Sequence, residues 1–274
     1  MKYVKFGKSE VIVSSICFGC SELWHDDKEL IQEAFNLGVT FFDLANIYGQ
    51  GKSEEMVGSV VKPFRKKVVL ATKVGMNWKT YEPEGGEEYI IKSCEESLKR
   101  LQTDYIDLYQ AHCFNSSETT SILKKLQSQG KILHFGVSNY NSYQLSSDPC
   151  IDGIVSNQIR FNFLQQDVYH DITPVCSNNN ISVMAYSPLC KGLMTGKFIG
   201  DEQFLQDDIR YKDPMFLGGA FRNNIHKVQV FLDENKVGQE TSIQTVLRWI
   251  TEKGVIPVVG SRTTAQLKEN VKIT

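Results

Sequence analysis

Apolar and polar positions alternate in blocks along almost the whole chain. Short runs rich in Val, Ile, Leu and Phe, typical of buried strands, are each followed by a longer segment with apolar residues every three or four positions, as in an amphipathic helix. The expected strands cover residues 16–20, 41–45, 67–75, 106–113, 132–139, 153–161, 181–189 and 255–261. The expected helices cover residues 26–38, 53–64, 87–102, 119–130, 170–180, 220–235, 242–254 and 263–271, with a short polar helix after residue 139.

This alternation predicts the fold class. Strands that alternate strictly with helices form right-handed βαβ units and a parallel sheet, and eight such units close naturally into a barrel. We therefore expect an α/β protein, a single-domain (β/α)8 barrel over residues 1–274. An open doubly wound sheet is the alternative, but the first strand–helix turn has no G-x-G-x-x-G and no strand is followed by a phosphate loop. Residues 190–220 form the longest irregular stretch, which predicts a functional lid or binding loop.

Composition narrows the partners. The chain is 41% hydrophobic and 23% charged, with a formal net charge of −2, so nothing electrostatic favours a nucleic acid or an anionic membrane. We expect a small-molecule partner and, without a stretch typical of a signal peptide or membrane span, a cytoplasmic location. Seven scattered cysteines do not suggest disulfides, and neither "CFGC" at 17–20 nor the dispersed histidines complete a metal site.

Four polar residues lie at or just beyond consecutive strand ends: Asp43, Tyr48, Lys73 and His112. Taken singly, each is more often an ordinary structural residue. In a barrel the carboxyl ends of the strands form the active site, so these side chains are expected to converge. A buried Lys73 needs a counter-ion, which Asp43 offers. Lys73 is then expected to lower the pKa of Tyr48 against the opposing effect of apolar walls, which makes Tyr48 a proton donor near neutral pH.

A proton donor of this kind suits a carbonyl that is reduced to an alcohol. No side chain supplies a hydride, so we expect a nicotinamide cofactor. The segments "FFDLANIYGQGKSEEMVG", "ATKVG" and "LYQAHC" resemble the aldo-keto reductase family, and the resemblance extends over essentially the whole chain. It implies a (β/α)8 barrel, NADPH or NADP+ as cofactor, and reversible reduction of aldehydes or ketones. Tyr48 would be the acid, Lys73 and Asp43 its tuners, and His112 the residue that orients the carbonyl.

The resemblance also implies the cofactor contacts. Gln158 would hold the nicotinamide carboxamide and Tyr186 would stack on its ring, while the segment "GSRTTAQLKEN" resembles the 2′-phosphate and adenine signature. The full set is Ser138, Asn139, Gln158, Tyr186, Ser187, Leu189, Gly192, Lys197, Arg210, Gly260, Ser261, Arg262, Gln266 and Asn270. The residues themselves favour NADPH over NADH, since helix N–H groups after Ser261 and the Arg262 guanidinium suit a phosphate. A plain helix cap with polar surface residues is the alternative.

The substrate side is less defined. Trp24 and Trp78 are the expected substrate contacts, with Tyr81 and Phe114 as weaker candidates. The chain stops soon after the adenine motif, whereas many family members continue with a further helix and tail. We therefore expect a pocket that stays open, or that the 190–220 loop or a neighbouring subunit closes. Closure by a neighbouring subunit would make the protein a homo-oligomer.

Two other functions remain as alternatives. The complete cofactor motif and the long 190–220 segment also resemble ion-channel auxiliary subunits of the same superfamily, in which a bound nucleotide acts as a redox sensor. A phosphosugar isomerase would use the same last-strand loop for its phosphate. Such an isomerase needs a free carboxylate base, whereas Asp43 is expected to be committed to Lys73.

Overall fold

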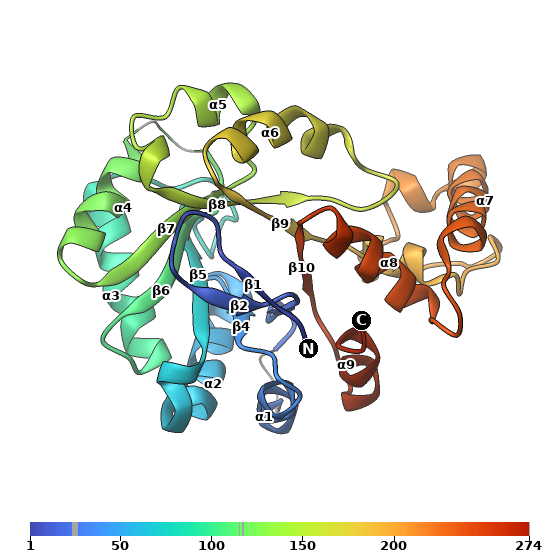
Figure 1. Cartoon of the computed structure of the whole chain (residues 1–274), viewed down its shortest axis with the longest axis horizontal. Helices are drawn as coiled ribbons and strands as arrows, with labels where there is room; N and C mark the ends of the chain where they lie inside the picture. Colours follow the sequence, from blue (N-terminus) through green and yellow to red (C-terminus); the bar gives the residue numbers. More distant parts are fainter. Residues whose placement is uncertain (24–26, 115, 117, 274) are drawn as a thin grey trace.

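Eight parallel strands close into a barrel within the part of the chain that the computed structural model describes, residues 1–23, 27–114, 116 and 118–273 (Figure 1). Each strand pairs with its neighbours in sequence, and β10 closes the ring against β3. The barrel strands are β3 (Cys17–Gly19), β4 (Phe41–Asp43), β5 (Val69–Val74), β6 (Ile106–Ala111), β7 (Ile132–Ser138), β8 (Ile154–Arg160), β9 (Ser182–Tyr186) and β10 (Ile256–Val259). All fall within the segments expected from the sequence, so the (β/α)8 barrel is confirmed and the open sheet is not.

Helices follow the barrel strands in the expected order. They are α1 (Lys28–Asn36), α2 (Lys52–Val61), α3 (Glu87–Leu101), α4 (Thr119–Ser128), α5 (Ser142–Ser146), α6 (Asp167–Asn178), α7 (Gly218–Asn235), α8 (Ser242–Glu252) and α9 (Thr264–Asn270). Each helix buries one part of its surface, as α1 does with Leu30, Ile31 and Ala34. Two helices, α7 and α8, lie between β9 and β10, and α7 stands apart from the ring of helices (Figure 1). No described helix has the length and apolar content of a membrane span.

A two-stranded antiparallel hairpin, β1 (Tyr3–Lys5) with β2 (Ile12–Ser14), precedes the barrel and was not expected from the sequence. Val13 of β2 and Phe6, which follows β1, are buried in one apolar cluster with barrel residues such as Phe41 and Leu108. The hairpin therefore closes the amino-terminal end of the barrel. All three residues of β1 and the first residue of β2 are exposed, so no buried apolar run marks these strands in the sequence.

Strand alternation positions the polar residues at the opposite end. Phe41 and Leu108 belong to the apolar cluster at the closed end. Successive side chains of a strand point to opposite faces, so Asp43 and Gln110, two residues further on, face the same interior. On β5, Lys73 lies two residues beyond Ala71 of the apolar cluster and therefore also faces the interior. Lys73 is the register partner of Gln110 on β6. The barrel interior is thus apolar at one end and polar at the carboxyl end, where this fold builds its sites.

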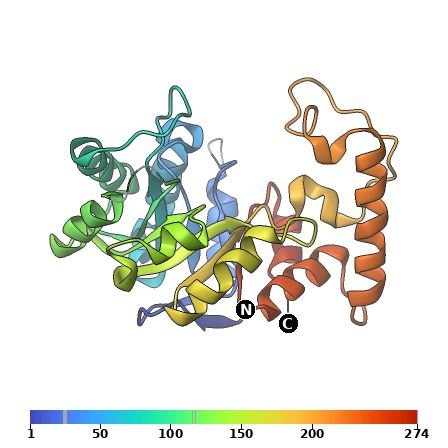
Figure 2. The ribbon, with the colours of Figure 1, turned by 90° about the horizontal axis from the view of Figure 1, so that it is seen from above.

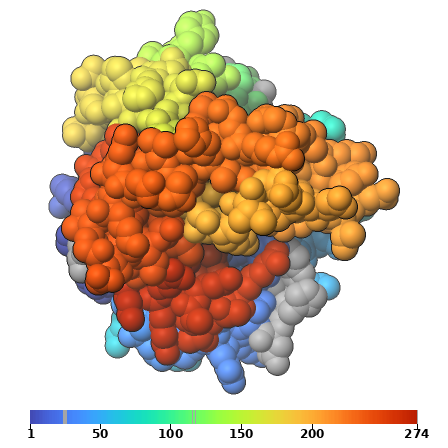
Figure 3. All heavy atoms as spheres, turned by 90° about the vertical axis from the view of Figure 1, so that its right-hand side faces the viewer, coloured from blue at the N-terminus to red at the C-terminus, as the bar shows by residue number. Residues whose placement is uncertain are grey.

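The expected long segment after β9 is irregular up to the start of α7 at Gly218, apart from the short 3-10 turns η4 (Cys190–Thr195) and η5 (Pro214–Phe216). It projects with α7 on one side of the barrel (Figure 2), and in the space-filling view it lies above the C-terminal part of the chain (Figure 3). Its own aromatic core holds it together: Phe198, Phe204, Phe216 and Phe221 meet with ring centroids 5.5–6.0 Å apart. The segment is therefore a folded unit rather than an unsupported connection.

Candidate active site

Lys73 lies at the centre of a buried polar cluster at the carboxyl end of the barrel. Its Nζ donates to Asp43 Oδ2 at 2.6 Å, to the Leu44 carbonyl at 2.8 Å and to the Tyr48 hydroxyl at 3.3 Å. Lys73 and Asp43 are 1% and 2% exposed, so neither charge is solvated and each depends on the other. The structure therefore brings together the lysine, the carboxylate and the phenol in the arrangement that the sequence suggested.

The turn after β4 directs Tyr48 toward this cluster. Tyr48 begins the 3-10 turn η1 (Tyr48–Gly51), in which Gly49, Gln50 and Gly51 all have left-handed backbone conformations, with φ of 53°, 59° and 88°. Two of the three are glycine, the residue that adopts this conformation without strain. The "YGQG" sequence thus supplies the tight turn that returns the chain from the strand end to α2.

A buried carboxylate ties this turn to the strand that carries Lys73. Glu54, in the first turn of α2, accepts hydrogen bonds from the Thr72 hydroxyl at 2.6 Å and from Arg100 Nε at 2.7 Å. Glu54 is fully buried, and its partners come from β5 and α3. The relative positions of Tyr48 and Lys73 are therefore held from outside the barrel as well as from within.

The pKa values show which protonation states the site holds. Burial raises the pKa of the Tyr48 hydroxyl, and this effect outweighs the attraction of the Lys73 ammonium. We expected Lys73 to lower the pKa of Tyr48 overall, and this expectation is wrong. Removal from water disfavours the phenolate more than the one cation favours it. Burial alone lowers the pKa of Lys73, but Asp43 and then Tyr48 favour the ammonium, and the net pKa is raised. At neutral pH the site holds a protonated phenol beside a paired ammonium.

His112 lines the same cavity, one residue beyond β6. Its backbone N–H donates to the Val74 carbonyl at 2.7 Å, and its ring stands edge-on to that of Tyr48 with centroids 6.2 Å apart. Burial, and then the nearby Lys73 ammonium, lower the pKa of His112 to about 3. The imidazole is therefore neutral at physiological pH. Its Nδ1 is buried without a partner among the described residues.

A chain of amide and hydroxyl groups continues from Asp43 across the barrel. Gln158 Nε2 donates to Asp43 Oδ1 at 2.8 Å, and the Ser138 hydroxyl donates to the Gln158 carbonyl at 2.8 Å. Asn139, in a left-handed conformation with φ of 60°, accepts from the Tyr186 hydroxyl at 3.0 Å. Ser138, Gln158 and Tyr186 lie in β7, β8 and β9, and Asn139 follows β7 directly; together they form a polar wall that leads away from Lys73.

One cavity of about 1220 Å³ joins these groups to the loops after β9 and β10. Its volume exceeds the roughly 300–1,000 Å³ typical of small-molecule sites. The expected residues that line it are Asp43, Tyr48, His112, Ser138, Asn139, Gln158, Tyr186, Ser187, Leu189, Gly192, Lys197, Arg210, Gly260, Ser261, Arg262 and Gln266. Lys73 lies behind Tyr48, and Asn270 lies behind Ser261, where its Nδ2 donates to the Ser261 hydroxyl at 3.0 Å.

The expected substrate residues are placed differently. Trp24 lies outside the described residues. Trp78 is 42% exposed, and the described cavity lining does not include it. Met76 and Cys113 line the cavity instead, in the loops that flank Lys73 and His112 in sequence. No sequence pattern marked Met76 or Cys113, because a thioether and a thiol are also common in apolar cores.

The phosphate end of the cavity was expected around α9. Thr263, rather than Gly260 or Ser261, caps this seven-residue helix by accepting from the Gln266 N–H at 3.2 Å. Gln266 Oε1 in turn accepts from the Arg262 N–H at 2.8 Å. Asn270 Oδ1 is buried without a partner among the described residues, and Asn270 Nδ2 donates to the Ser261 hydroxyl. These groups fit the adenosine and phosphate portion of a dinucleotide.

The sequence reasoning missed several polar residues at the site, among them Gln110, Glu22 and Asp208. Gln110 Nε2 lies 3.4 Å from Asp43 Oδ1, and the alternation of Leu108, Gln110 and His112 along one strand face could have revealed it. Glu22 and Asp208 line the cavity and pair with Arg262 and Arg210. No motif marks either pair: Asp208 lies two residues from Arg210 in an irregular segment, and Glu22 lies 240 positions from Arg262.

Comparisons with known proteins agree with this fold and site. The model of the Aldo/keto reductase family matches residues 23–274. The chain is 32% identical to Aldo-keto reductase YhdN from Bacillus subtilis (strain 168), over 100% of this chain and 89% of the relative. It is 30% identical to Aldo-keto reductase yakc [NADP(+)] from Schizosaccharomyces pombe, over 94% of this chain and 83% of the relative.

Solved structures give the same result. The glycerol dehydrogenase AKR11B4 from Gluconobacter oxydans superposes with a TM-score of 0.89 at 27% identity, covering 99% of this chain and 89% of that one. An aldo-keto reductase from Klebsiella pneumoniae, solved in complex with NADPH, superposes with a TM-score of 0.76 at 25% identity, covering 98% and 88%. The likeness spans the barrel and the long segment after β9 together.

Proposed function

Because the chain belongs to the aldo/keto reductase family, we propose that it is an NADP(H)-dependent oxidoreductase that reversibly reduces an aldehyde or ketone to an alcohol, with Tyr48 as the general acid. One observation carries the proposal: the Lys73 ammonium contacts both Asp43 and the Tyr48 hydroxyl, at 2.6 and 3.3 Å. A phenol held by a buried, neutralised cation beside a large cavity is suited to proton transfer to a carbonyl oxygen.

Each member of the cluster has a distinct task in this proposal. Tyr48 keeps its proton at neutral pH, because burial raises its pKa, and gives it up only to a strongly basic oxygen such as the developing alkoxide. Lys73 stabilises the phenolate that remains, and Asp43 keeps Lys73 charged and in place. The neutral His112 orients the carbonyl through Nε2, since a neutral imidazole with its proton on that nitrogen donates a hydrogen bond without adding charge.

The hydride is the cofactor's contribution when NADPH is bound, since no side chain here supplies one. Aldo-keto reductases use NADP(H), as the names of one relative and one solved complex state for those proteins. We assign the carboxamide to Gln158, Ser138 and Asn139, the nicotinamide ring to Tyr186, and the phosphates and adenosine to the loops after β9 and β10. Lys197 Nζ lies 5.1 Å from the centroid of the Phe198 ring and has no carboxylate partner among the described residues. Its charge is therefore available to a phosphate.

The segment from 190 to 220 is proposed to cover the cofactor. Lys191, Lys197 and Arg210 of this segment line the cavity, and its aromatic core is formed in the structure described here. Trp78 remains a proposed substrate contact, although it is 42% exposed in the described structure. For the substrate itself, the wall near His112 offers Met76 and Cys113, a weakly polar surface suited to a small carbonyl compound.

A two-stage measurement tests the function. NADPH is first titrated into the protein with fluorescence as the readout, and NADPH oxidation is then followed by absorbance with a panel of aliphatic and aromatic aldehydes and ketones. Saturable binding with oxidation by at least one carbonyl supports the proposal. Tight binding with no oxidation across the panel would favour the nucleotide sensor instead. Absence of binding would contradict both.

A further inference from the structure

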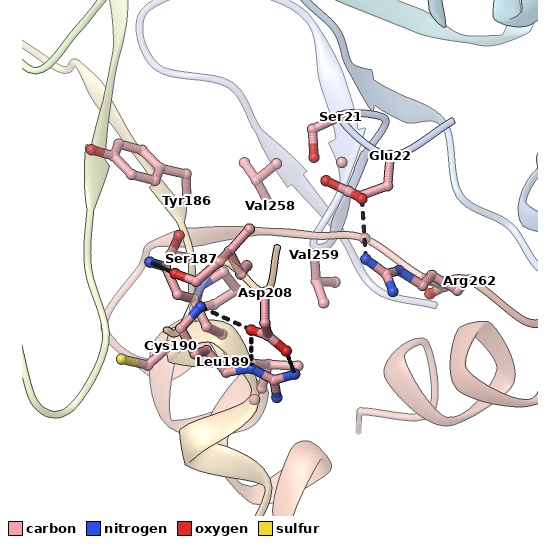
Figure 4. Close-up of a pocket in the computed structure, with 18 of the residues that line it drawn as sticks. Ser21, Glu22, Tyr186, Ser187, Leu189, Cys190, Asp208, Val258, Val259 and Arg262 are labelled. Atoms are coloured by element: carbon pink, nitrogen blue, oxygen red, sulfur yellow. Dashed lines mark hydrogen bonds and ion pairs between the residues drawn. The ribbon is translucent and has the colours of Figure 1, made fainter. Parts of the chain in front are cut away.

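An ion pair crosses the phosphate end of the cavity. Arg262 Nη2 lies 3.1 Å from Glu22 Oε2, and both residues line the cavity (Figure 4). Glu22 follows β3 and Arg262 follows β10, two strands that pair side by side in the barrel. A carboxylate therefore lies at the position where the 2′-phosphate of NADPH was expected to meet Arg262.

Most cations of this cavity are already neutralised. Lys191 pairs with Asp213 at 2.7 Å, Arg210 with Asp208 at 2.5 Å, and Arg262 with Glu22 at 3.1 Å. Only Lys197, of the four described lysines and arginines that line the cavity, has no carboxylate partner there. A site that favours a nucleotide with an additional phosphate is usually rich in unpaired cations. Here three of the four lining cations already have a carboxylate partner.

The Glu22 pair differs from the other two. Asp208 accepts from Arg210 Nε, Nη2 and the backbone N–H, and Asp213 caps η5 while it holds Lys191, so both carboxylates build the 190–217 segment. Glu22 has no such second contact among the described residues. Its partner is 240 positions away in sequence, and the two side chains are 53% and 75% exposed. Such an exposed pair contributes little to folding, so Glu22 is free to act on a ligand.

We propose that Glu22 determines cofactor specificity by competing with a 2′-phosphate for Arg262 and by accepting a hydrogen bond from a free ribose 2′-hydroxyl. The inference rests on the proposed function, since it concerns the same nucleotide site. A phosphate beside Glu22 is repelled and must share or displace its arginine, whereas a hydroxyl group donates to the carboxylate without repulsion. The site therefore accepts NADH as well as NADPH, with a smaller preference for NADPH than Arg262 alone would give.

The test measures binding, without turnover. NADPH and NADH are titrated at fixed ionic strength into the wild type, Glu22→Gln and Glu22→Asp, and the ratio of the two Kd values is compared. Glu22→Gln should bind NADPH about fivefold more tightly and NADH about twofold more weakly, so the ratio shifts about tenfold toward NADPH. Glu22→Asp keeps the charge on a shorter side chain, so its ratio of Kd values should lie between those of the wild type and Glu22→Gln.

Two controls separate the outcomes. Glu10→Gln makes the same change of net charge in the exposed Lys5–Glu10 pair of the N-terminal hairpin, and it should leave the ratio unchanged. Titration of 2′,5′-ADP against ADP repeats the comparison without a nicotinamide, so only the adenosine end is probed. The role of Glu22 would be overturned if Glu22→Gln left the ratio of Kd values unchanged. It would also be overturned if Glu10→Gln shifted the ratio equally. A wild type that binds neither dinucleotide would instead overturn the proposed function.

Discussion

The side-chain amide of Gln158 donates to Asp43 Oδ1 at 2.8 Å, while Lys73 donates to the other oxygen of the same carboxylate at 2.6 Å. Asp43 thus joins two proposed parts of the site, the proton donor and the amide that faces the nicotinamide. With its nitrogen committed to Asp43, Gln158 presents Oε1 to the cavity as an acceptor. The carboxylate fixes which end of the Gln158 amide meets a ligand.

The role of Tyr48 is open to a direct test. Tyr48→Phe removes the transferable proton and leaves the ring in place, so carbonyl reduction should fall about 10²- to 10⁴-fold. The Kd for NADPH should stay within about threefold of the wild-type value, because the hydroxyl is not assigned to cofactor binding. Steady-state rates and fluorescence titration measure the two quantities.

Tyr143→Phe is the matched control for that substitution. Tyr143 is 78% exposed on α5, so its loss of a hydroxyl should change neither rate nor binding. A Tyr48→Phe variant with near wild-type turnover would show that another group donates the proton.

The buried ion pair has a predictable cost when it is broken. Lys73→Met leaves the Asp43 carboxylate buried and uncompensated, so the free energy of unfolding should fall by about 3–5 kcal/mol. The double variant Lys73→Met with Asp43→Asn removes both charges and should recover part of that loss. Urea unfolding followed by circular dichroism measures each value.

The exposed pair of Lys5 with Glu10 provides the comparison for this loss. Lys5→Met should cost less than about 1 kcal/mol, because water solvates the remaining carboxylate. If Lys73→Met were equally mild, Asp43 would have to be reached by solvent or take up a proton at little cost.

His112 should make stability depend on pH. Its pKa is lowered to about 3 in the folded chain, whereas an unfolded histidine titrates near 6.5, so the unfolded state binds the additional proton between these values. The contribution of His112 to stability is complete above about pH 6.5 and is lost progressively as the pH falls toward 3. Its slope is at most about 1.4 kcal/mol per pH unit.

Urea unfolding of the wild type and of His112→Gln between about pH 4 and pH 7 isolates the contribution of His112 to the pH dependence of stability. The glutamine variant should lose less stability on acidification, while titrations of the carboxylates and of His134 are common to both proteins and cancel in the difference. Parallel curves for the two proteins would mean that His112 is charged or solvated in the folded state.

The raised pKa of Tyr48 predicts the pH profile of reduction. Because the hydroxyl stays protonated to a pH above that of an ordinary tyrosine, near 10, kcat/KM for carbonyl reduction should not fall between about pH 6 and pH 9.5. Initial rates across that range measure the profile. A decline centred near pH 7 to 8 would indicate that Lys73 outweighs burial in the free enzyme.

The period-two pattern of residues 41–43, 71–73 and 108–112 contained more information than the motif segments alone. It places Asp43, Lys73, Gln110 and His112 on inward-facing positions of three adjacent strands, and Gln110 follows from the same rule that gives the others. The pattern failed at the hairpin, whose strands are mostly exposed and carry no buried apolar run. The sequence reasoning also failed for the pKa of Tyr48, because it overestimated the effect of Lys73 relative to burial.

The sequence by itself determined the order of strands and helices, the closed barrel and the residues at the strand ends, because hydrophobic periodicity and chain order are local properties. Tertiary structure alone decided how charges pair across loops, as with Glu22 and Arg262, and how strongly water is excluded from Tyr48. Both depend on distances between segments far apart in the chain and on the depth of burial, and neither quantity is encoded in any single stretch of residues.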